Sequence, residues 1–263
     1  MKAIILAAGE GKRLHPLTLN QPKCLVELFG KSILKWQVDV FNHFNITDIA
    51  VVKGYMEEKI NIPDINYYIN KKFRDTNMVE TLFTAREIMD DSVIVSYGDI
   101  IFEKHVFEKL FSSSANISLI VDKNWLSYWN TRFKDPLDDA ESLTIDKNGN
   151  ITSIGQKTTE IADIQAQYIG LMKFRGEGLE ILKSFYDKSK LSAQNGKNPL
   201  NSSLIFEKSF MTDLLQGMID NGVKIKAIPI SNSWLELDSY NDFVVYKNMY
   251  EKNTLSKFFN VSN

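Results

Sequence analysis

The chain has 263 residues, of which 44% are hydrophobic, and this is enough for the core of one large α/β domain. Its formal net charge of −2 argues against a nucleic-acid-binding protein, whose contact surface is usually strongly basic. No apolar stretch approaches the roughly 20 residues needed to span a bilayer, so we expect a soluble, cytoplasmic protein without a membrane partner.

Apolar runs of strand length alternate with stretches of helical spacing along the chain. The predicted strands are 3–7, 49–52, 67–69, 93–97, 117–121 and 225–230. The predicted helices are 32–44, 78–89, 103–111 and 239–251. Strands that alternate with helices favour an α/β fold with a Rossmann-like, doubly wound and mainly parallel sheet.

The pattern changes to that of antiparallel strands after about residue 140. The stretch LTIDKNGNITSI reads as two alternating strands joined by a turn at 147–149, and YIGLMKF reads as a further strand. We therefore expect a mixed sheet with a small antiparallel insertion at about 122–175, within one domain that spans 1–263. The polar stretch 187–203 is predicted to be a loop.

The first strand runs into a loop rich in glycine and positive charge, AIILAAGEGKRLHPLTLNQPKCLVEL. Buried strands that lead into glycine-rich turns commonly bind nucleotide phosphates. The dinucleotide fingerprint would need a glycine where Leu14 stands. The P-loop would need a glycine at Leu6 and a hydroxyl at Arg13. The local cations Lys12, Arg13 and Lys23 therefore indicate a small anionic ligand held by a different loop.

A carboxylate follows the fourth predicted strand in VIVSYGDI. Ligands of an open parallel sheet bind at the carboxyl ends of its strands, so Asp99 is expected near the glycine loop. An aspartate in this place can hold a divalent cation over phosphates. The alternative is a capping role at the start of helix 103–111.

The stretch LAAGEGKRLHPLTLNQPKCLV resembles the signature of nucleotidyltransferases that make sugar nucleotides and CDP-alcohols, over about twenty consecutive positions. Within this resemblance, Gly98-Asp99 corresponds to the family's first metal aspartate, and Asp238 in SWLELDSYNDF to its second. The resemblance implies the fold of nucleotide-diphospho-sugar transferases and Mg²⁺ as cofactor. Lys12 departs from the pattern, since the family usually has a small or hydroxylated residue there.

Each part of this site has an expected role. Glycines 9 and 11 let the backbone approach the triphosphate. Arg13 offers its guanidinium to the β- and γ-phosphates, and Lys23 can reach the α-phosphate, where charge gathers in the transition state. Asp99 and Asp238 are expected to hold Mg²⁺. The nucleotide-binding set is predicted to be Leu6, Ala7, Ala8, Gly9, Gly11, Lys12, Asn77, Thr81 and Gly98.

Further stretches narrow the resemblance to the cytidylyltransferases that act on phosphocholine, aminoethylphosphonate and similar small compounds. These stretches are YINKKFRDTNMVETLF, WLSYWNTRFKDPLDDAESL, IGQKT and QYIGLMKF. The resemblance implies that Lys157 grips the acceptor phosphate. The predicted acceptor-binding set is Trp129, Asp138, Glu141, Lys157 and Tyr168.

The segment 125–141 places aromatic residues before a run of carboxylates. Such a combination makes a good receptor for an ammonium group. The alternative is a solvated acidic turn, with the aromatic side chains covering the edge of the sheet.

The sequence thus predicts a CTP-dependent cytidylyltransferase whose acceptor is a small phosphorylated or phosphonylated compound. The expected partners are CTP and this acceptor, and a homodimer is compatible with the chain. Two alternatives stay open: a sugar-1-phosphate nucleotidyltransferase that uses UTP or dTTP, and a non-catalytic nucleotide-binding regulator. Retention of both cations and both carboxylates argues against the regulator.

Cys24 is the only cysteine, which excludes an internal disulfide and a cysteine-based zinc site. Its neighbour Lys23 could lower the pKa of the thiol. Without a base partner in view, we expect Cys24 to be a small apolar residue at the start of a strand, not a nucleophile.

Overall fold

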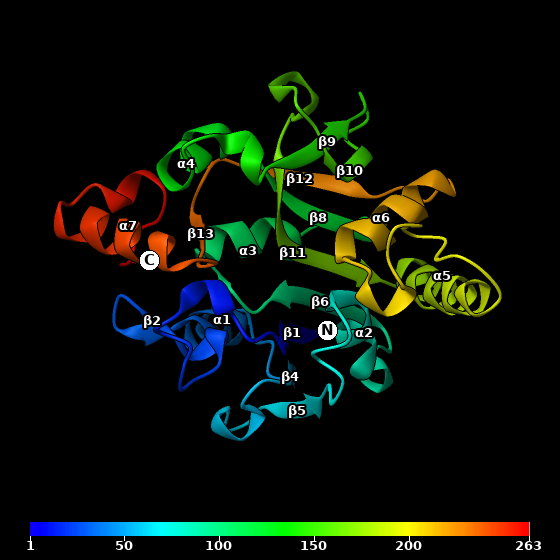
Figure 1. Cartoon of the computed structure of the whole chain (residues 1–263), viewed down its shortest axis with the longest axis horizontal. Coiled ribbons are helices and arrows are strands. Elements are labelled where there is room, and N and C mark those ends of the chain that lie inside the picture. Colours follow the sequence, from blue (N-terminus) through cyan, green and yellow to red (C-terminus); the bar gives the residue numbers. More distant parts are fainter. Residues whose placement is uncertain (263) are drawn as a thin grey trace.

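A mixed sheet forms the centre of the computed structural model, which describes residues 1–262 (Figure 1). Within these residues the sheet has seven strands: β1 (Lys2–Ala7), β4 (Ile49–Lys53), β5 (Asn66–Ile69), β6 (Ser92–Tyr97), β8 (Ile117–Asp122), β11 (Gln167–Arg175) and β12 (Lys226–Ile230). Their order is β12-β8-β11-β6-β1-β4-β5. All neighbours are parallel except those of β11, which runs antiparallel to both β6 and β8. The predicted mainly parallel mixed sheet is confirmed.

Helices cover both faces of the sheet, because β1 is apolar on both sides. Ala3 and Ile5 belong to one buried cluster, whereas Ile4 and Leu6 belong to the other. The first cluster packs under α1 (Ile33–His43), α3 (Lys104–Phe111), α4 (Trp125–Arg132) and α7 (Tyr240–Glu251). The second packs under α2 (Met78–Thr84), α5 (Glu177–Gln194) and α6 (Met211–Asp220). Alternation along the strand thus builds two cores from one sheet.

Short antiparallel pairs surround the sheet. They are β2 (Glu27–Leu28) with β3 (Lys31–Ser32), β7 (Ile100–Phe102) with β13 (Trp234–Glu236), and β9 (Glu141–Ile145) with β10 (Ile151–Lys157). Single 3-10 turns occur at Lys12–Leu14, Lys23–Leu25, Glu57–Lys59, Arg86–Ile88, Pro136–Asp138, Ile161–Asp163, Phe206–Lys208 and Leu255–Lys257.

The predicted hairpin is the pair β9–β10. Gly149 adopts the left-handed conformation that its turn requires, with φ 77°, and the Asp146 carboxylate accepts from the amides of Asn148 and Asn150. The expected antiparallel region needs one correction, since β11 lies in the central sheet between β6 and β8. Among the strands expected in this region, β9 and β10 form a separate two-stranded sheet beside β12 (Figure 1).

Two predicted boundaries are wrong. Helix α5 extends to Gln194, so the first part of the predicted loop 187–203 is helical. Its buried contacts are spaced along one face, at Leu182, Tyr186 and Ser189, and the polar residues between them occupy the solvent side. Helix α2 ends at Thr84 and only a 3-10 turn follows, so the predicted helix 78–89 is too long.

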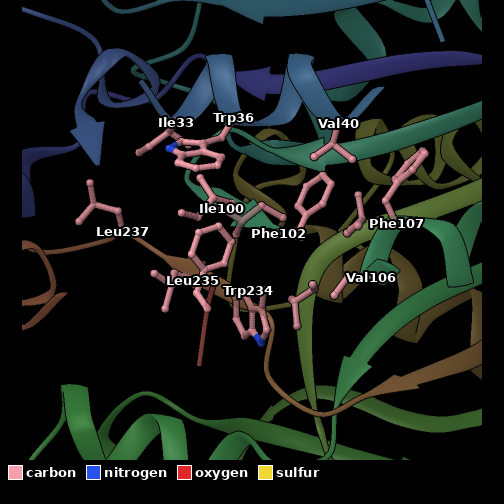
Figure 2. Close-up of a cluster of buried hydrophobic side chains, with 14 of the residues drawn as sticks. Ile33, Trp36, Val40, Ile100, Phe102, Val106, Phe107, Trp234, Leu235 and Leu237 are labelled. Atoms are coloured by element: carbon pink, nitrogen blue, oxygen red, sulfur yellow. The ribbon is translucent and has the colours of Figure 1, made fainter. Parts of the chain in front are cut away.

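Figure 2 shows the core beneath the β7–β13 ribbon. Trp36 and Phe107 reach it from α1 and α3, while Phe102 and Trp234 come from the paired strands. All four side chains are buried. This packing attaches the ribbon to the sheet. Within residues 1–262, no helix is long and apolar enough to cross a membrane.

Candidate active site

The glycine loop after β1 folds back against the turn that carries Lys23. Gly11 is left-handed, with φ 63°, and a Cβ there would lie 2.9 Å from the Cβ of Lys23. The hydroxyl of Thr18 donates to the Gly11 carbonyl at 2.7 Å. The second glycine of the motif is therefore required by backbone conformation and by close packing.

The β6 strand ends beside the same loop. The amide of Gly98 donates to the Leu6 carbonyl at 2.9 Å, and a Cβ at Gly98 would lie 2.6 Å from that oxygen. Only glycine allows this approach without a shift of the backbone. It brings Asp99 next to the end of β1, as the carboxyl-end rule predicts.

The β7–β13 ribbon brings the second carboxylate to the first. These strands pair Glu236 with Ile100, and the amide of Leu237 donates to the Asp99 carbonyl at 2.9 Å. Asp99 and Asp238, far apart in the sequence, therefore lie side by side at one end of a two-stranded ribbon.

The two carboxylates share one ammonium group. The Nζ atom of Lys23 lies 2.7 Å from Asp99 Oδ2 and 2.8 Å from Asp238 Oδ1. Burial by itself lowers the pKa of Lys23, but attraction to the two carboxylates outweighs it, so the pKa is raised. Arg13 adds a contact of 2.7 Å to Asp238 Oδ2. Burial opposes ionisation of Asp238, but Lys23 and then Arg13 lower its pKa below the usual value.

One carboxylate oxygen of this cluster has no partner. Asp99 Oδ1 is buried and makes no hydrogen bond. A buried carboxylate oxygen costs free energy unless a proton donor or a cation meets it, so this atom is a candidate metal ligand. Within residues 1–262, no group of three or more His, Cys, Asp or Glu side chains forms a metal site from protein atoms alone.

Arg13, Lys23, Asp99 and Asp238 all line one cavity of about 760 Å³. The cavity also gathers the whole predicted nucleotide-binding set: Leu6, Ala7, Ala8, Gly9, Gly11, Lys12, Asn77, Thr81 and Gly98. One end carries the cations and carboxylates described above. The wall at the start of α2 is formed by Thr76, Asn77, Met78 and Thr81, which carry no charge, and Phe73 and Arg74 of the preceding loop line the cavity as well.

Sequence reasoning missed two charged residues of the cavity wall, Glu10 and Arg74. Glu10 pairs with Lys12 at 2.9 Å and with Arg74 Nε at 2.9 Å. Hydrogen bonds from these two cations lower the pKa of the Glu10 carboxyl. Glu10 could have been identified from its place between Gly9 and Gly11, where an acidic residue stands in an otherwise cationic loop. Arg74 had no such signal, because the chain brings it to the loop from beyond β5.

Three predicted acceptor residues meet in a second cavity of about 490 Å³. Asp138 precedes β9, Glu141 begins it, and Lys157 ends the partner strand β10. Burial, and then repulsion from Asp139 and Asp213, raise the pKa of Glu141 to about 7. This cavity is acidic apart from Lys157.

Trp129 is corrected from a ligand contact to a core residue. Its side chain is buried, and the guanidinium of Arg132 lies 5.3 Å from its ring centroid. Its indole N–H donates to Asp139 Oδ2 at 3.0 Å. The Trp129 side chain is only 4% exposed and lines neither cavity, so it does not contact an acceptor in either of them. The aromatic side chains of α4 fit the alternative in which they cover the sheet.

Tyr168 lies in β11 and packs edge-on against Tyr97, with 5.7 Å between the ring centroids. Tyr97 directly precedes Gly98 and Asp99. Burial raises the pKa of both phenols above their usual values. Tyr168 therefore supports the strand end that carries the aspartate, and it does not line the second cavity with the other acceptor residues.

A buried arginine, which sequence reasoning did not identify, orients the Asp238 loop. The side chain of Arg132 is only 1% exposed, and its Nε and Nη2 atoms donate to the two oxygens of Asp242 at 3.0 and 3.2 Å. Asp242 Oδ2 in turn accepts from the amides of Asp238 and Ser239. Arg132 also contacts Glu236 Oε2 at 2.7 Å.

Cys24 lies in the 3-10 turn Lys23–Leu25 and is almost fully buried. Burial raises the pKa of its thiol to about 12. A thiol with this pKa is not ionised at neutral pH, so the structure agrees with a buried, unreactive residue, but Cys24 lies in a 3-10 turn and not at the start of a strand.

Comparison with known proteins identifies relatives of this chain. Residues 3–143 match the model of the MobA-like NTP transferase domain. CTP:phosphoglutamine cytidylyltransferase of Campylobacter jejuni is 38% identical over 256 residues, covering 93% of this chain and 98% of that protein. Choline-phosphate cytidylyltransferase of Streptococcus pneumoniae is 29% identical over 157 residues, covering 58% and 68%.

Solved structures share the fold. The structure of CTP:phosphocholine cytidylyltransferase from Streptococcus pneumoniae aligns with a TM-score of 0.72 at 22% identity, covering 95% of this chain and 98% of that one. The inositol-1-phosphate CTP transferase of T. maritima aligns with a TM-score of 0.70 at 21% identity, covering 97% and 95%.

Proposed function

This chain belongs to the MobA-like NTP transferase family and is a nucleotidyltransferase, and on that premise we propose that it transfers CMP from CTP to a small phosphorylated acceptor. Relatives named as cytidylyltransferases support CTP as the donor. The observation that carries the proposal is the convergence of Arg13, Lys23, Asp99 and Asp238 at one end of a nucleotide-sized cavity.

The reaction is a displacement at the α-phosphorus. An anionic oxygen of the acceptor's phosphate or phosphonate attacks this atom, and the bond to the bridging oxygen of the β-phosphate breaks. Pyrophosphate leaves, and CMP stays linked to the acceptor. A phosphate with a second pKa near 6 is already an anion at neutral pH, so no general base is needed.

The cations of the site neutralise charge during this step. Lys23 is fully protonated because its pKa is raised, and it lies 14% exposed at the cavity floor. We assign it to the α-phosphate, where negative charge accumulates in the transition state. Arg13 is 70% exposed at the cavity mouth and can turn toward the β- and γ-phosphates.

Asp99 and Asp238 are the residues that would hold Mg²⁺. The buried, unpartnered Oδ1 atom of Asp99 fits a metal ligand, and the lowered pKa of Asp238 keeps that carboxylate ionised. Two carboxylates supplemented by phosphate oxygens are a usual set of protein and substrate ligands for this ion. When bound, Mg²⁺ would supply positive charge to the phosphates.

We place the acceptor between the two cavities. Asp139 lines the second cavity, and repulsion from Asp238, which lines the first, contributes to the raised pKa of the Asp139 carboxyl. Lys157 can pair with the acceptor phosphate. Asp138 and Glu141 then favour an acceptor whose other end carries an ammonium or amide group.

Pyrophosphate release tests this assignment across CTP, UTP, dTTP, ATP and GTP. The acceptors would be phosphorylated glutamine, phosphocholine, aminoethylphosphonate and glucose-1-phosphate. We expect turnover with CTP and an acceptor that carries nitrogen. Faster turnover of UTP or dTTP with glucose-1-phosphate would replace this proposal by a sugar-nucleotide function.

A further inference from the structure

A buried amide lies directly behind the uncharged wall of the nucleotide cavity. Asn70 follows β5, is 6% exposed and does not itself line the cavity. Its Nδ2 atom donates to two hydroxyls that do line it, Thr76 Oγ1 at 2.9 Å and Thr81 Oγ1 at 3.0 Å.

The direction of every hydrogen bond in this group is determined by its partners. The backbone amide of Lys72 donates to Asn70 Oδ1 at 3.0 Å, which leaves the nitrogen of Asn70 facing the threonines. The hydroxyl of Thr76 donates to the Lys72 carbonyl at 2.9 Å, and the hydroxyl of Thr81 donates to the Asn77 carbonyl at 3.0 Å. Carbonyl oxygens can only accept, so both hydroxyl protons are committed.

The consequence is that these two hydroxyls can accept hydrogen bonds from a ligand in the cavity but cannot donate to it. Each threonine oxygen uses one lone pair for Asn70 and its proton for a backbone carbonyl. One lone pair remains on each oxygen. A ligand group that meets these hydroxyls must therefore bring its own hydrogen.

The position of this wall assigns it to the nucleobase, if the proposed function holds. The triphosphate of CTP goes to Arg13 and Lys23 at the charged end of the cavity. The base is then left with the uncharged wall at Thr76 and Thr81.

We propose that Asn70 is a specificity-determining residue, which acts by holding the two threonine hydroxyls as acceptors. The exocyclic amino group of cytosine donates a hydrogen and satisfies such an acceptor. The carbonyl at the same place in uracil or thymine would meet a lone pair. Leaving buried polar groups unpaired in this way disfavours the wrong base by about 10- to 100-fold in kcat/KM.

The test compares kcat/KM for CTP and UTP in Thr81→Val, which keeps the shape of the side chain but removes the acceptor. We expect the CTP-to-UTP ratio to fall by about tenfold or more, through loss of CTP turnover. Thr84→Val is the matched control. It lies on the same helix, its hydroxyl donates to the Glu80 carbonyl at 2.9 Å in the same manner, and it does not line the cavity.

Asn70→Ala provides a second, independent change. Without the amide, the hydroxyls can rotate and donate into the cavity, so we expect UTP turnover to rise while CTP turnover falls. A general loss of stability would lower both activities and leave their ratio unchanged.

The outcomes separate this inference from the proposed function. If the wild-type enzyme prefers CTP but neither variant changes the ratio, the inference is overturned and the cytidylyltransferase function stands. If the wild-type enzyme prefers UTP, both are overturned.

Discussion

At the scale of single residues, the site is a set of charges that satisfy one another. Lys23 lies between Asp99 and Asp238, and Arg13 contacts the outer oxygen of Asp238. The cations, which suit phosphates, and the carboxylates, which suit a metal ion, therefore lie in direct contact with one another. Electrostatic attraction holds both sets in place before any ligand arrives, which reduces the reorganisation that binding requires.

Lys23→Ala should lower kcat by about 100-fold or more, because one preorganised donor to the α-phosphate is lost. The KM for CTP should change much less. Steady-state kinetics with saturating acceptor would measure both values. Lys12→Ala gives a useful comparison, since its ammonium is 76% exposed and pairs with Glu10. That variant should affect the KM for CTP more than kcat. Near-normal kcat in Lys23→Ala would remove Lys23 from the mechanism.

If both carboxylates bind one Mg²⁺ ion, as we propose, Asp99→Asn and Asp238→Asn should each abolish most turnover, and EDTA should do the same to the wild-type enzyme. The double variant should be little worse than either single variant, as expected for groups that act as a unit. Activity assays with a Mg²⁺ titration would measure this. Fully multiplicative losses would instead assign the carboxylates to separate tasks. The alternative capping role of Asp99 is wrong, because the N-cap of α3 is Glu103 and the Asp99 carboxylate pairs with Lys23 instead.

At the scale of secondary structure elements, helix α4 controls where helix α7 begins. Arg132 is the last residue of α4, and its guanidinium binds Asp242 in the first turn of α7. Asp242 holds the amides of Asp238 and Ser239 as part of the helix cap. The position of Asp238, which we propose as a metal ligand, thus depends on a contact between two helices that are distant in the sequence.

Arg132→Met should destabilise the protein by about 3–5 kcal/mol, because it leaves two buried carboxylates without their cation. In the fraction that folds, kcat should fall more than the KM for CTP, since Asp238 loses its support. Urea unfolding and steady-state kinetics would measure the two effects. Arg132→Lys keeps the charge but cannot bind both oxygens of Asp242, so it should recover part of each loss. A stable Arg132→Met variant with normal kcat would contradict this role.

At the scale of the whole molecule, the chain carries two cavities of different charge. The cation-rich nucleotide cavity lies at the carboxyl ends of β1 and β6, whereas the acidic cavity lies along the hairpin β9–β10. Glu141 is partly buried among other carboxyls, which is unfavourable for its charged form. This arrangement makes the stability of the protein depend on pH.

The pKa of Glu141 is raised to about 7, so the folded state binds its proton more tightly than the unfolded state does. Stability from this group is present below the unfolded pKa and declines as pH rises through 7. We expect an unfolding free energy lower by about 1–3 kcal/mol at pH 8 than at pH 5 from this group alone. Glu141→Gln should remove that part of the slope, measured by urea unfolding at several pH values. Glu160→Gln, an exposed change at the same cavity, controls for the loss of one negative charge. An identical slope in Glu141→Gln and wild type would contradict the assignment.

The sequence by itself determined the features that depend on neighbouring residues. Strand and helix periods follow from the alternation of apolar side chains, so β1, β6 and α1 were predicted nearly to their ends. The glycine loop and the aspartate after β6 were also predictable, because the carboxyl ends of parallel strands share one edge of the sheet.

The tertiary structure decided what depends on contacts between distant segments. The three-residue strands β7 and β13 are too short to show a period, yet their pairing places Asp238 beside Asp99. Trp129 is buried in the core and does not line the second cavity, which its position in the sequence did not reveal. The role that we propose for Asn70 rests on its hydrogen bonds to Thr76 and Thr81, which are formed only in the folded chain. A single sequence records the type of each side chain, whereas the hydrogen-bond partners of that side chain are set by the packing around it.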